Sequence, residues 1–108
     1  EVDIIRDRNS LYRETNEGLI ENVYTIKVLN KTQQTQTYTI AVKGLPDYEY
    51  IGEQTVTVVG GTVYSTPISV ATDAYNLEDT VTDIFISVTT TIDGETVTVD
   101  EPTKFLYR

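Results

Sequence analysis

The sequence predicts an all-β domain from its composition, its period-two patterning and its regularly spaced turn signals. Thr, Val and Ile together supply 42 of the 108 residues, against 3 Ala and 6 Leu. β-branched side chains fit a pleated sheet and lose rotamer freedom in a helix. The length is that of one ordinary domain, which can bury a core without a disulfide or a metal. We therefore treat residues 1–108 as a single domain.

Alternating apolar and polar residues place the first strands. A strand is expected at 2–7, and the stretch 22–30 puts Tyr24, Ile26 and Val28 on one face. That alternation is typical of a half-buried strand. After a polar loop at 30–36, the next strand repeats the pattern and turns its own inward residues, Tyr38, Ile40 and Val42, to the core.

Four further strands are expected in the second half, at 55–59, 62–72, 82–90 and 95–100, with Val56, Val58, Ile84, Ile86 and Val88 inward. Gly60-Gly61 and Asp93-Gly94 are turn signals, and the second favours a two-residue hairpin. Pro67 has no N–H to donate, so its strand is interrupted or lies at a sheet edge there.

About seven antiparallel strands with turns at these intervals indicate an immunoglobulin-like β-sandwich. The Cys and Trp residues of antibody domains are absent, so the generic sandwich is expected. Tyr75 lies between two strands, where it either forms a corner hydrogen bond or is a loop aromatic.

The chain lacks Cys, His, Met and Trp. This excludes thiol chemistry, the usual zinc sites, iron–sulfur and haem ligation, and histidine acid–base catalysis. An enzyme would have to rely on carboxylates alone. No apolar run approaches the roughly 18–20 residues that span a bilayer.

Charge is unevenly distributed along the chain, whose formal net charge is −9. Residues 44–103 contain eleven acidic side chains and no Lys or Arg. Nucleic-acid binding is excluded because it needs basic groups against the phosphates. The charge either keeps the domain soluble or attracts a cationic protein partner.

Three motifs in the first 45 residues are distinctive: Arg-Asp-Arg-Asn at 6–9, Leu-Tyr-Arg at 11–13, and Glu21-Asn22-x-Tyr24. With them the chain resembles the C-terminal domain of the FixG family, also called CcoG or RdxA. These are membrane-bound accessory proteins for assembly of the cbb-type cytochrome c oxidase. The later strands fit the family in spacing and in Gly44-Leu45, though less distinctively.

The resemblance implies a multi-pass membrane protein with a segment that binds two 4Fe–4S clusters elsewhere in the parent chain. It implies that the present domain is the C-terminal piece, on the periplasmic side of the bacterial cytoplasmic membrane. The family is linked to copper handling during oxidase maturation. Because no cluster-binding cysteine lies here, no cofactor or metal site is carried over onto these residues, and the domain is expected to be non-catalytic.

Arg6, Arg8 and Arg13 are the first candidate site. In the family layout they follow the last membrane segment, where guanidinium groups suit lipid phosphates or carboxylates of the parent protein. The alternative is structural: Arg6 and Arg8 share one face of the first strand, where they pair with acidic side chains of neighbouring strands or hold the following loop.

Tyr48 and Tyr50 are the second candidate site, as alternate aromatics beside a turn that present a partner patch or form the inward pair of a short strand. Asn22 and Asn30 flank the best strand, where capping is favoured over binding. The oxygen donors of a loop could hold calcium, but their spacing is not that of an EF-hand; they are Asp73, Asn76, Glu78 and Asp79.

Two functions remain after these exclusions. The first is a non-catalytic interaction module that binds an oxidase subunit or an assembly factor, with a cationic partner favoured by the acidic stretch. The second is an adhesin-like or carbohydrate-binding sandwich that uses its tyrosines and calcium.

Overall fold

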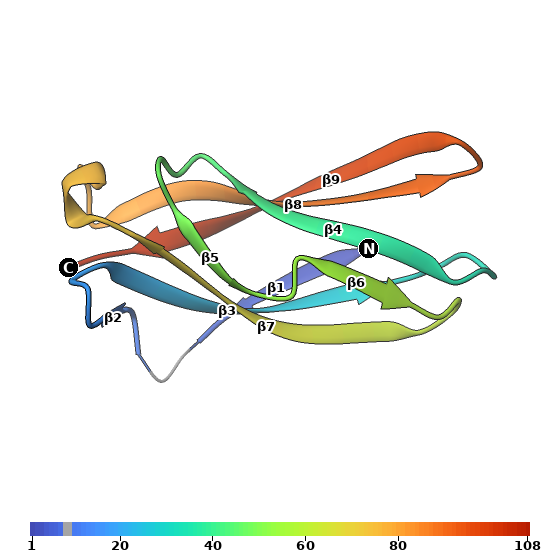
Figure 1. The fold of residues 1–108 in the computed structure, drawn as a ribbon, viewed down its shortest axis with the longest axis horizontal. Helices are drawn as coiled ribbons and strands as arrows, with labels where there is room; N and C mark the ends of the chain where they lie inside the picture. The colour runs from blue at the N-terminus through green and yellow to red at the C-terminus, as the bar shows by residue number, and fades with distance from the viewer. Residues whose placement is uncertain (8–9) are drawn as a thin grey trace.

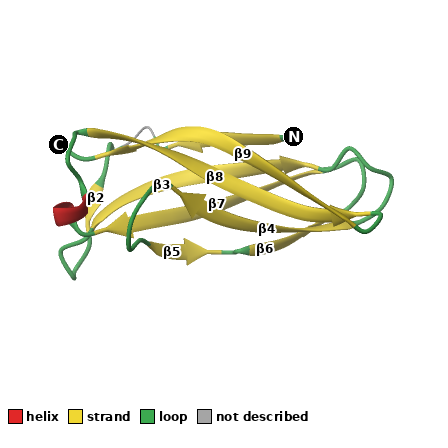
Figure 2. Cartoon of the chain, turned by 90° about the horizontal axis from the view of Figure 1, so that it is seen from above, coloured by secondary structure: helices red, strands yellow, loops and turns green. Residues whose placement is uncertain are grey.

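Two antiparallel β-sheets pack face to face in the computed structural model, which describes residues 1–7 and 10–108 (Figures 1 and 2). The described strands are β1 (Val2–Arg6), β2 (Arg13–Glu14), β3 (Ile20–Leu29), β4 (Gln36–Lys43), β5 (Glu49–Gly52), β6 (Thr55–Val58), β7 (Val63–Thr72), β8 (Val81–Ile92) and β9 (Glu95–Leu106). One short 3₁₀ turn, η1 (Ala74–Asn76), precedes β8. The described residues contain no helix that is long and apolar enough to cross a membrane.

The first sheet, sheet A, has the strand order β1-β3-β7-β5, and β2 pairs with β3 beside β1. The second, sheet B, has the order β6-β4-β8-β9. The longest ladders are β3 with β7, from Ile20 opposite Thr72 to Leu29 opposite Val63, and the β8–β9 hairpin. These observations confirm the immunoglobulin-like sandwich.

The core lies between the sheets and is built from the residues that the alternation places inward. Tyr24, Ile26, Ile40, Ile84 and Ile86 are each fully buried. The other inward predictions, Val28, Tyr38, Val42, Val56, Val58 and Val88, are buried as well. Period two therefore identified the buried face correctly on every strand for which it was read.

The described part of the chain has nine strands, two more than predicted. β2 has only two residues, and β5, with the sequence Glu-Tyr-Ile-Gly, does not alternate apolar and polar side chains. β9 also continues past the predicted end at residue 100 to Leu106, through Pro102. Proline is tolerated there because β9 is an edge strand of sheet B.

Pro67 lies where β7 changes from an inner strand to an edge. β5 pairs with β7 only from Ala71 to Ile68, so Pro67 has no neighbour on that side from β5. Its partner on the other side is Thr25 of β3. The predicted edge position is confirmed, and the strand continues without interruption.

Two turns depend on glycine, one for its positive φ and the other for its lack of a Cβ. The Asp93-Gly94 hairpin has φ values of 50° and 81°, the signs that a type I′ turn requires, and joins β8 to β9 as predicted. At Gly60, an added Cβ would lie 2.6 Å from the carbonyl carbon of Gln33. The turn after β6 therefore packs directly on the β3–β4 loop, and only glycine fits.

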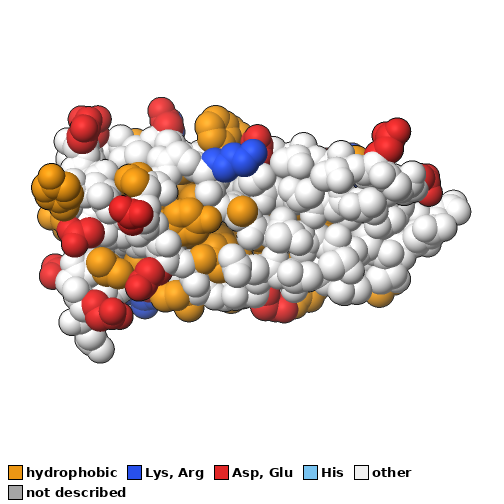
Figure 3. Space-filling model, turned by 45° about the horizontal axis from the view of Figure 1, so that its top comes forward, with side chains coloured by type: hydrophobic (Ala, Val, Ile, Leu, Met, Phe, Trp, Pro, Cys, Tyr) orange, Lys and Arg blue, Asp and Glu red, His pale blue; other side chains and the backbone are white. Residues whose placement is uncertain are grey.

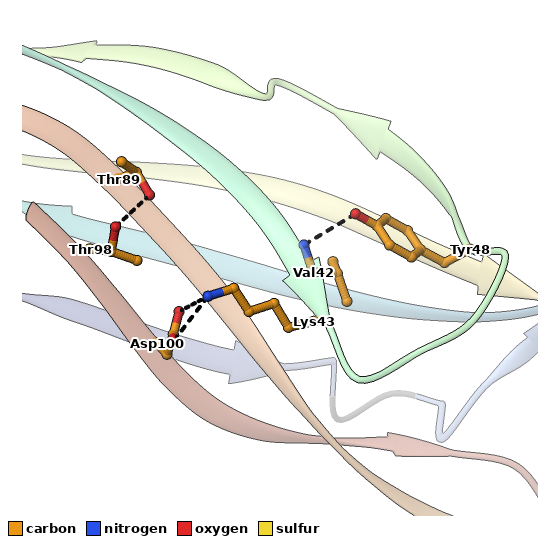
Figure 4. A network of polar contacts seen from close by, with 6 residues as sticks. All are labelled: Val42, Lys43, Tyr48, Thr89, Thr98 and Asp100. Carbon is orange, nitrogen blue, oxygen red and sulfur yellow. Dashed lines mark hydrogen bonds and ion pairs between the residues drawn. The ribbon is translucent and has the colours of Figure 1, made fainter. Parts of the chain in front are cut away.

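A row of threonines crosses the outer face of sheet B. Thr55, Thr39, Thr89 and Thr98 lie opposite one another in turn on β6, β4, β8 and β9. The hydroxyls of Thr89 and Thr98 are 3.1 Å apart (Figure 4). β-branched side chains with a polar atom suit an exposed strand face, so much of this face is covered without charge.

We predict that Ile86→Ala lowers the free energy of unfolding by about 2–5 kcal/mol, because it leaves a cavity between the sheets. Ile86 is fully buried, whereas its neighbour Phe85 points outward and is 42% exposed. Phe85→Ala is the matched control and should cost less. Urea denaturation followed by circular dichroism measures both, and equal losses would contradict the assigned inner face.

Candidate functional site

Side chains of sheet A bind the backbone of β9 along one open side of the sandwich. Asn22 is buried on β3; its amide nitrogen donates to the Leu106 carbonyl at 2.9 Å, and its amide oxygen accepts from the Leu106 N–H at 2.8 Å. The Tyr24 hydroxyl donates to the Lys104 carbonyl at 2.8 Å. We call this set of contacts the β9 seam. It joins β3, an inner strand of sheet A, to β9, the edge strand of sheet B, and these two strands share no ladder.

The segment before β3 extends the same seam. The Tyr12 hydroxyl donates to the Arg108 carbonyl at 2.8 Å, and the Tyr12 ring meets that of Tyr107 edge to face at 5.4 Å between centroids. Arg13 on β2 forms an ion pair of 2.7 Å with Glu21 on β3. Pairing with an acid of a neighbouring strand was predicted for Arg6 and Arg8, and the structure shows it for Arg13.

Arg6 ends β1 opposite Tyr24, so its side chain starts from the inward face but remains exposed at the rim. It lines a hollow of about 430 Å³ together with Ile4, Leu11 and Leu106. No described carboxylate lies within 4 Å of Arg6 in an ion pair. Arg8 falls outside the described residues. Contact of these arginines with lipid or a partner stays a prediction.

Tyr48 and Tyr50 lie at the opposite edge of sheet A, beside and within β5. Both rings pack against the core. The Tyr50 hydroxyl donates to the Glu53 carbonyl at 2.7 Å, and the Tyr48 hydroxyl accepts a long hydrogen bond of 3.4 Å from the Val42 N–H (Figure 4). Their geometry is that of an inward pair, and a role as a partner patch stays a prediction.

Asn30, at the end of β3, organises the β3–β4 loop. It is fully buried, and its amide nitrogen donates to the carbonyls of Gln34 and Val58 at 2.8 and 2.9 Å. Its amide oxygen accepts from the N–H and the hydroxyl of Thr32 at 2.9 and 2.7 Å. Every polar atom of the side chain is therefore used in holding the loop.

Two of the four calcium candidates make local hydrogen bonds within their loop. The Asp73 carboxylate caps η1 by accepting from the Tyr75 N–H at 2.9 Å, and the Asn76 amide donates to the Thr72 hydroxyl at 3.1 Å. The Tyr75 ring is 92% exposed, so it is a loop aromatic and not a corner residue. In the described part of the chain, no three acidic side chains come close enough to hold a metal ion.

Comparison with known proteins decides the family. The family model described as "IG-like fold at C-terminal of FixG, putative oxidoreductase" matches residues 1–108. This chain belongs to the FixG C-terminal domain family. The resemblance seen in the motifs of the first 45 residues is thereby confirmed.

Solved structures agree with the FixG assignment. A FixG-related protein from Vibrio parahaemolyticus is 37% identical with a TM-score of 0.84, and the match covers 100% of this chain and 95% of that one. The cupredoxin domain of amoB from Nitrosocaldus yellowstonii is 11% identical with a TM-score of 0.57, and the match covers 80% of this chain and 54% of that chain. That second likeness is one of fold alone. No curated protein matches the sequence.

The FixG-type domain itself does not offer the ligands of a redox centre. Iron–sulfur clusters are held by cysteine thiolates, and cuprous ion prefers cysteine and methionine sulfur. The chain contains neither residue and no histidine. Its donor set therefore does not fit a cluster or a cuprous site, and we derive no redox step through its residues.

Sequence reasoning missed the β9 seam, although it singled out the motifs that build it. Tyr12, Asn22 and Tyr24 all belong to those motifs, and all three bind the backbone at the end of β9. The available signal was a polar or phenolic group at inward positions of a strand, since such a group needs a partner when it is buried.

We predict that the free energy of unfolding falls above about pH 10, where tyrosines of the unfolded chain lose their protons. Burial raises the pKa of Tyr50 to about 12, with Tyr48 and Glu53 adding to the rise, and burial also raises the pKa of Tyr24 despite the nearby Arg6. The folded state therefore holds these protons more tightly, and its advantage is lost as pH rises through the folded pKa.

Urea denaturation at pH values from about 8 to 12 measures this loss. The double variant Tyr24→Phe, Tyr50→Phe removes both groups and should show a shallower decline with pH. Tyr75→Phe, at an exposed ring, is the control and should follow the parent curve. An unchanged slope in the double variant would contradict the prediction.

Proposed function

We propose that this FixG-type domain is a non-catalytic interaction module on the periplasmic side of the bacterial cytoplasmic membrane. Its parent would be a multi-pass iron–sulfur protein that assists assembly of the cbb-type cytochrome c oxidase, with the copper handling done elsewhere in that protein. The observation that carries the proposal is a FixG-family match over the whole chain, in a sequence without any soft metal ligand or histidine. We therefore expect the domain to bind a partner through its surface and not to catalyse a reaction.

The charge of that surface indicates the partner. Residues 44–103 hold eleven acidic side chains and no basic one. On the face seen in Figure 3, acidic side chains surround apolar ones and basic side chains are few. A negative surface attracts cationic partners over a distance and favours their approach. We infer that the partner, an oxidase subunit or an assembly factor, presents a basic surface.

A carbohydrate-binding role is less well supported. Sugar binding by tyrosines relies on open ring faces, whereas Tyr48 and Tyr50 pack against the core. Tyr75 is exposed, but it stands on a single turn, η1. We therefore develop the protein-binding function only.

We predict that the immobilised 108-residue domain retains an oxidase subunit or an assembly factor from detergent-solubilised membranes of a bacterium that makes the cbb-type oxidase. Retention should weaken as NaCl rises from about 0.05 to 0.5 M, because salt screens exposed charges. Mass spectrometry identifies the retained proteins.

A variant with fewer acids provides the control for this measurement. Glu49→Gln, Asp79→Asn and Glu95→Gln together remove three exposed carboxylates that make no described ion pair, and they should reduce retention. Retention that is indifferent to both salt and these changes would rule out a cationic partner. Absence of any enriched oxidase or assembly protein would contradict the proposed function.

A further inference from the structure

One side of β9 pairs with no strand of the described chain, because β9 ends the order of sheet B, although β1 of sheet A comes close to β9. The Tyr107 N–H donates to the Thr80 carbonyl on the β8 side. In an antiparallel pair, backbone groups of successive residues point alternately toward and away from the partner strand. The β8–β9 register runs unbroken from Glu95 to Leu106, so the even-numbered residues of β9 point to the open side.

Most of that open side is protected by the fold. Leu106 and Lys104 are bound by Asn22 and Tyr24 at the β9 seam. Pro102 is also even-numbered, so the position that faces outward has no N–H to offer. Proteins commonly protect exposed edges in these ways, since a free edge invites another strand.

Protection stops at Asp100. The even-numbered residues before Pro102 are Thr96, Thr98 and Asp100, and within the described residues the backbone groups that they point outward have no hydrogen-bond partner. The outward-facing side chain of Asp100 is held by Lys43 at 3.1 Å (Figure 4). We call the stretch from Thr96 to Asp100 the open edge.

An apolar cleft lies beside the open edge, between the two sheets. Its volume is about 150 Å³, and its walls come from both layers, with Val2 and Val28 from sheet A and Tyr38 and Val88 from sheet B. The inward residues of the open edge, Val97 and Val99, also line it, yet they remain 43% and 37% exposed. Inward valines this exposed leave apolar area for another side chain to cover.

The charge around the open edge is acidic. Asp93, Glu95, Asp100 and Glu101 lie on β9 or on the turn that leads into it. The one basic side chain that lines the cleft, Lys31, is paired with Glu1 at 3.3 Å. A cationic segment is thus favoured at this edge over a neutral or acidic one.

We propose that the open edge binds an extended, basic segment of a partner protein, which adds to sheet B as a further strand beside β9. Its backbone pairs with Thr96, Thr98 and Asp100, alternate apolar side chains enter the cleft, and the intervening Lys or Arg side chains lie on the outer face beside Asp100. This is strand addition, in which the backbone supplies affinity and alternate pockets supply specificity. The inference rests on the proposed function and specifies the site and the chemistry of its partner.

A synthetic peptide of alternating lysine and valine, seven residues long and blocked at both ends, is the probe. Fluorescence anisotropy with the labelled peptide measures its affinity for the 108-residue domain. A peptide of the same composition with the three valines adjacent loses the period of two and should bind at least about tenfold more weakly. A peptide of alternating glutamate and valine tests the charge, and it should likewise bind at least about tenfold more weakly. No measurable binding of the alternating basic peptide overturns the proposal.

Thr98→Pro removes the outward N–H at the centre of the open edge, at a position equivalent in direction to Pro102. We expect about tenfold weaker peptide binding, as for a lost backbone hydrogen bond in a desolvated site. Thr98→Val also removes the hydroxyl contact with Thr89 but keeps the N–H, so it should bind within about twofold of the parent. Equal binding by the Pro and Val variants overturns the site.

Amide hydrogen exchange followed by NMR gives a reading that needs no variant. In the free domain the Thr98 N–H should exchange faster than those of Val97 and Val99, which point toward β8. The peptide should slow exchange at Thr98, and binding without that protection would place the peptide elsewhere. In the membrane pull-down, a Thr98→Pro domain that retains its partners as the parent does would reject the open edge while leaving the proposed function intact.

Discussion

The sandwich depends on how its two sheets are joined where no ladder connects them. Asn22 and Tyr24 are buried, so their polar groups need partners, and the end of β9 needs partners for its outward carbonyls and N–H. The two side chains and the backbone of β9 form hydrogen bonds with one another. Among the described residues no buried side-chain nitrogen or oxygen lacks a hydrogen bond. This reciprocal arrangement fixes the end of β9 against β3, and Tyr12 adds a third contact at Arg108.

The same arrangement determines what remains available for binding. The seam and Pro102 occupy the second half of the β9 edge, so only the half near the Asp93-Gly94 hairpin keeps free backbone groups. There the layers diverge enough to leave a cleft. The outer face of sheet B carries a row of threonines with the Lys43–Asp100 ion pair beside it, and further acids, Asp93 and Glu95, lie at the hairpin where this edge begins. The cleft and the acidic side chains therefore lie at the same edge of the domain.

Much of the fold could be predicted because burial on one face imposes a period of two, and the inward residues of β3, β4, β6 and β8 were identified that way. β2 has too few residues for a period, β5 has adjacent apolar side chains and no alternation, and β9 runs through a proline that usually ends a strand. The seam was beyond prediction, since it joins residues 84 positions apart, Asn22 and Leu106. For the candidate sites, sequence indicated ion pairing of Arg6 and Arg8 and an inward placement of Tyr48 and Tyr50 as alternatives. It did not indicate the pairing of Arg13 with Glu21, which depends on the position of the neighbouring strand.

The order in which successive strands join the two sheets affects how the domain folds and unfolds. From β3 to β8 each successive strand belongs to the opposite sheet, so neither layer can be completed while the other is missing. Closing pairs such as β3 with β7 requires long loops to form first, which slows assembly and makes it all-or-none. A nascent chain that has emerged only as far as β7 holds every strand of sheet A but only β4 and β6 of sheet B, so the inner face of sheet A still lacks much of its cover. Proteolytic nicking between layers would therefore release no stable half-domain.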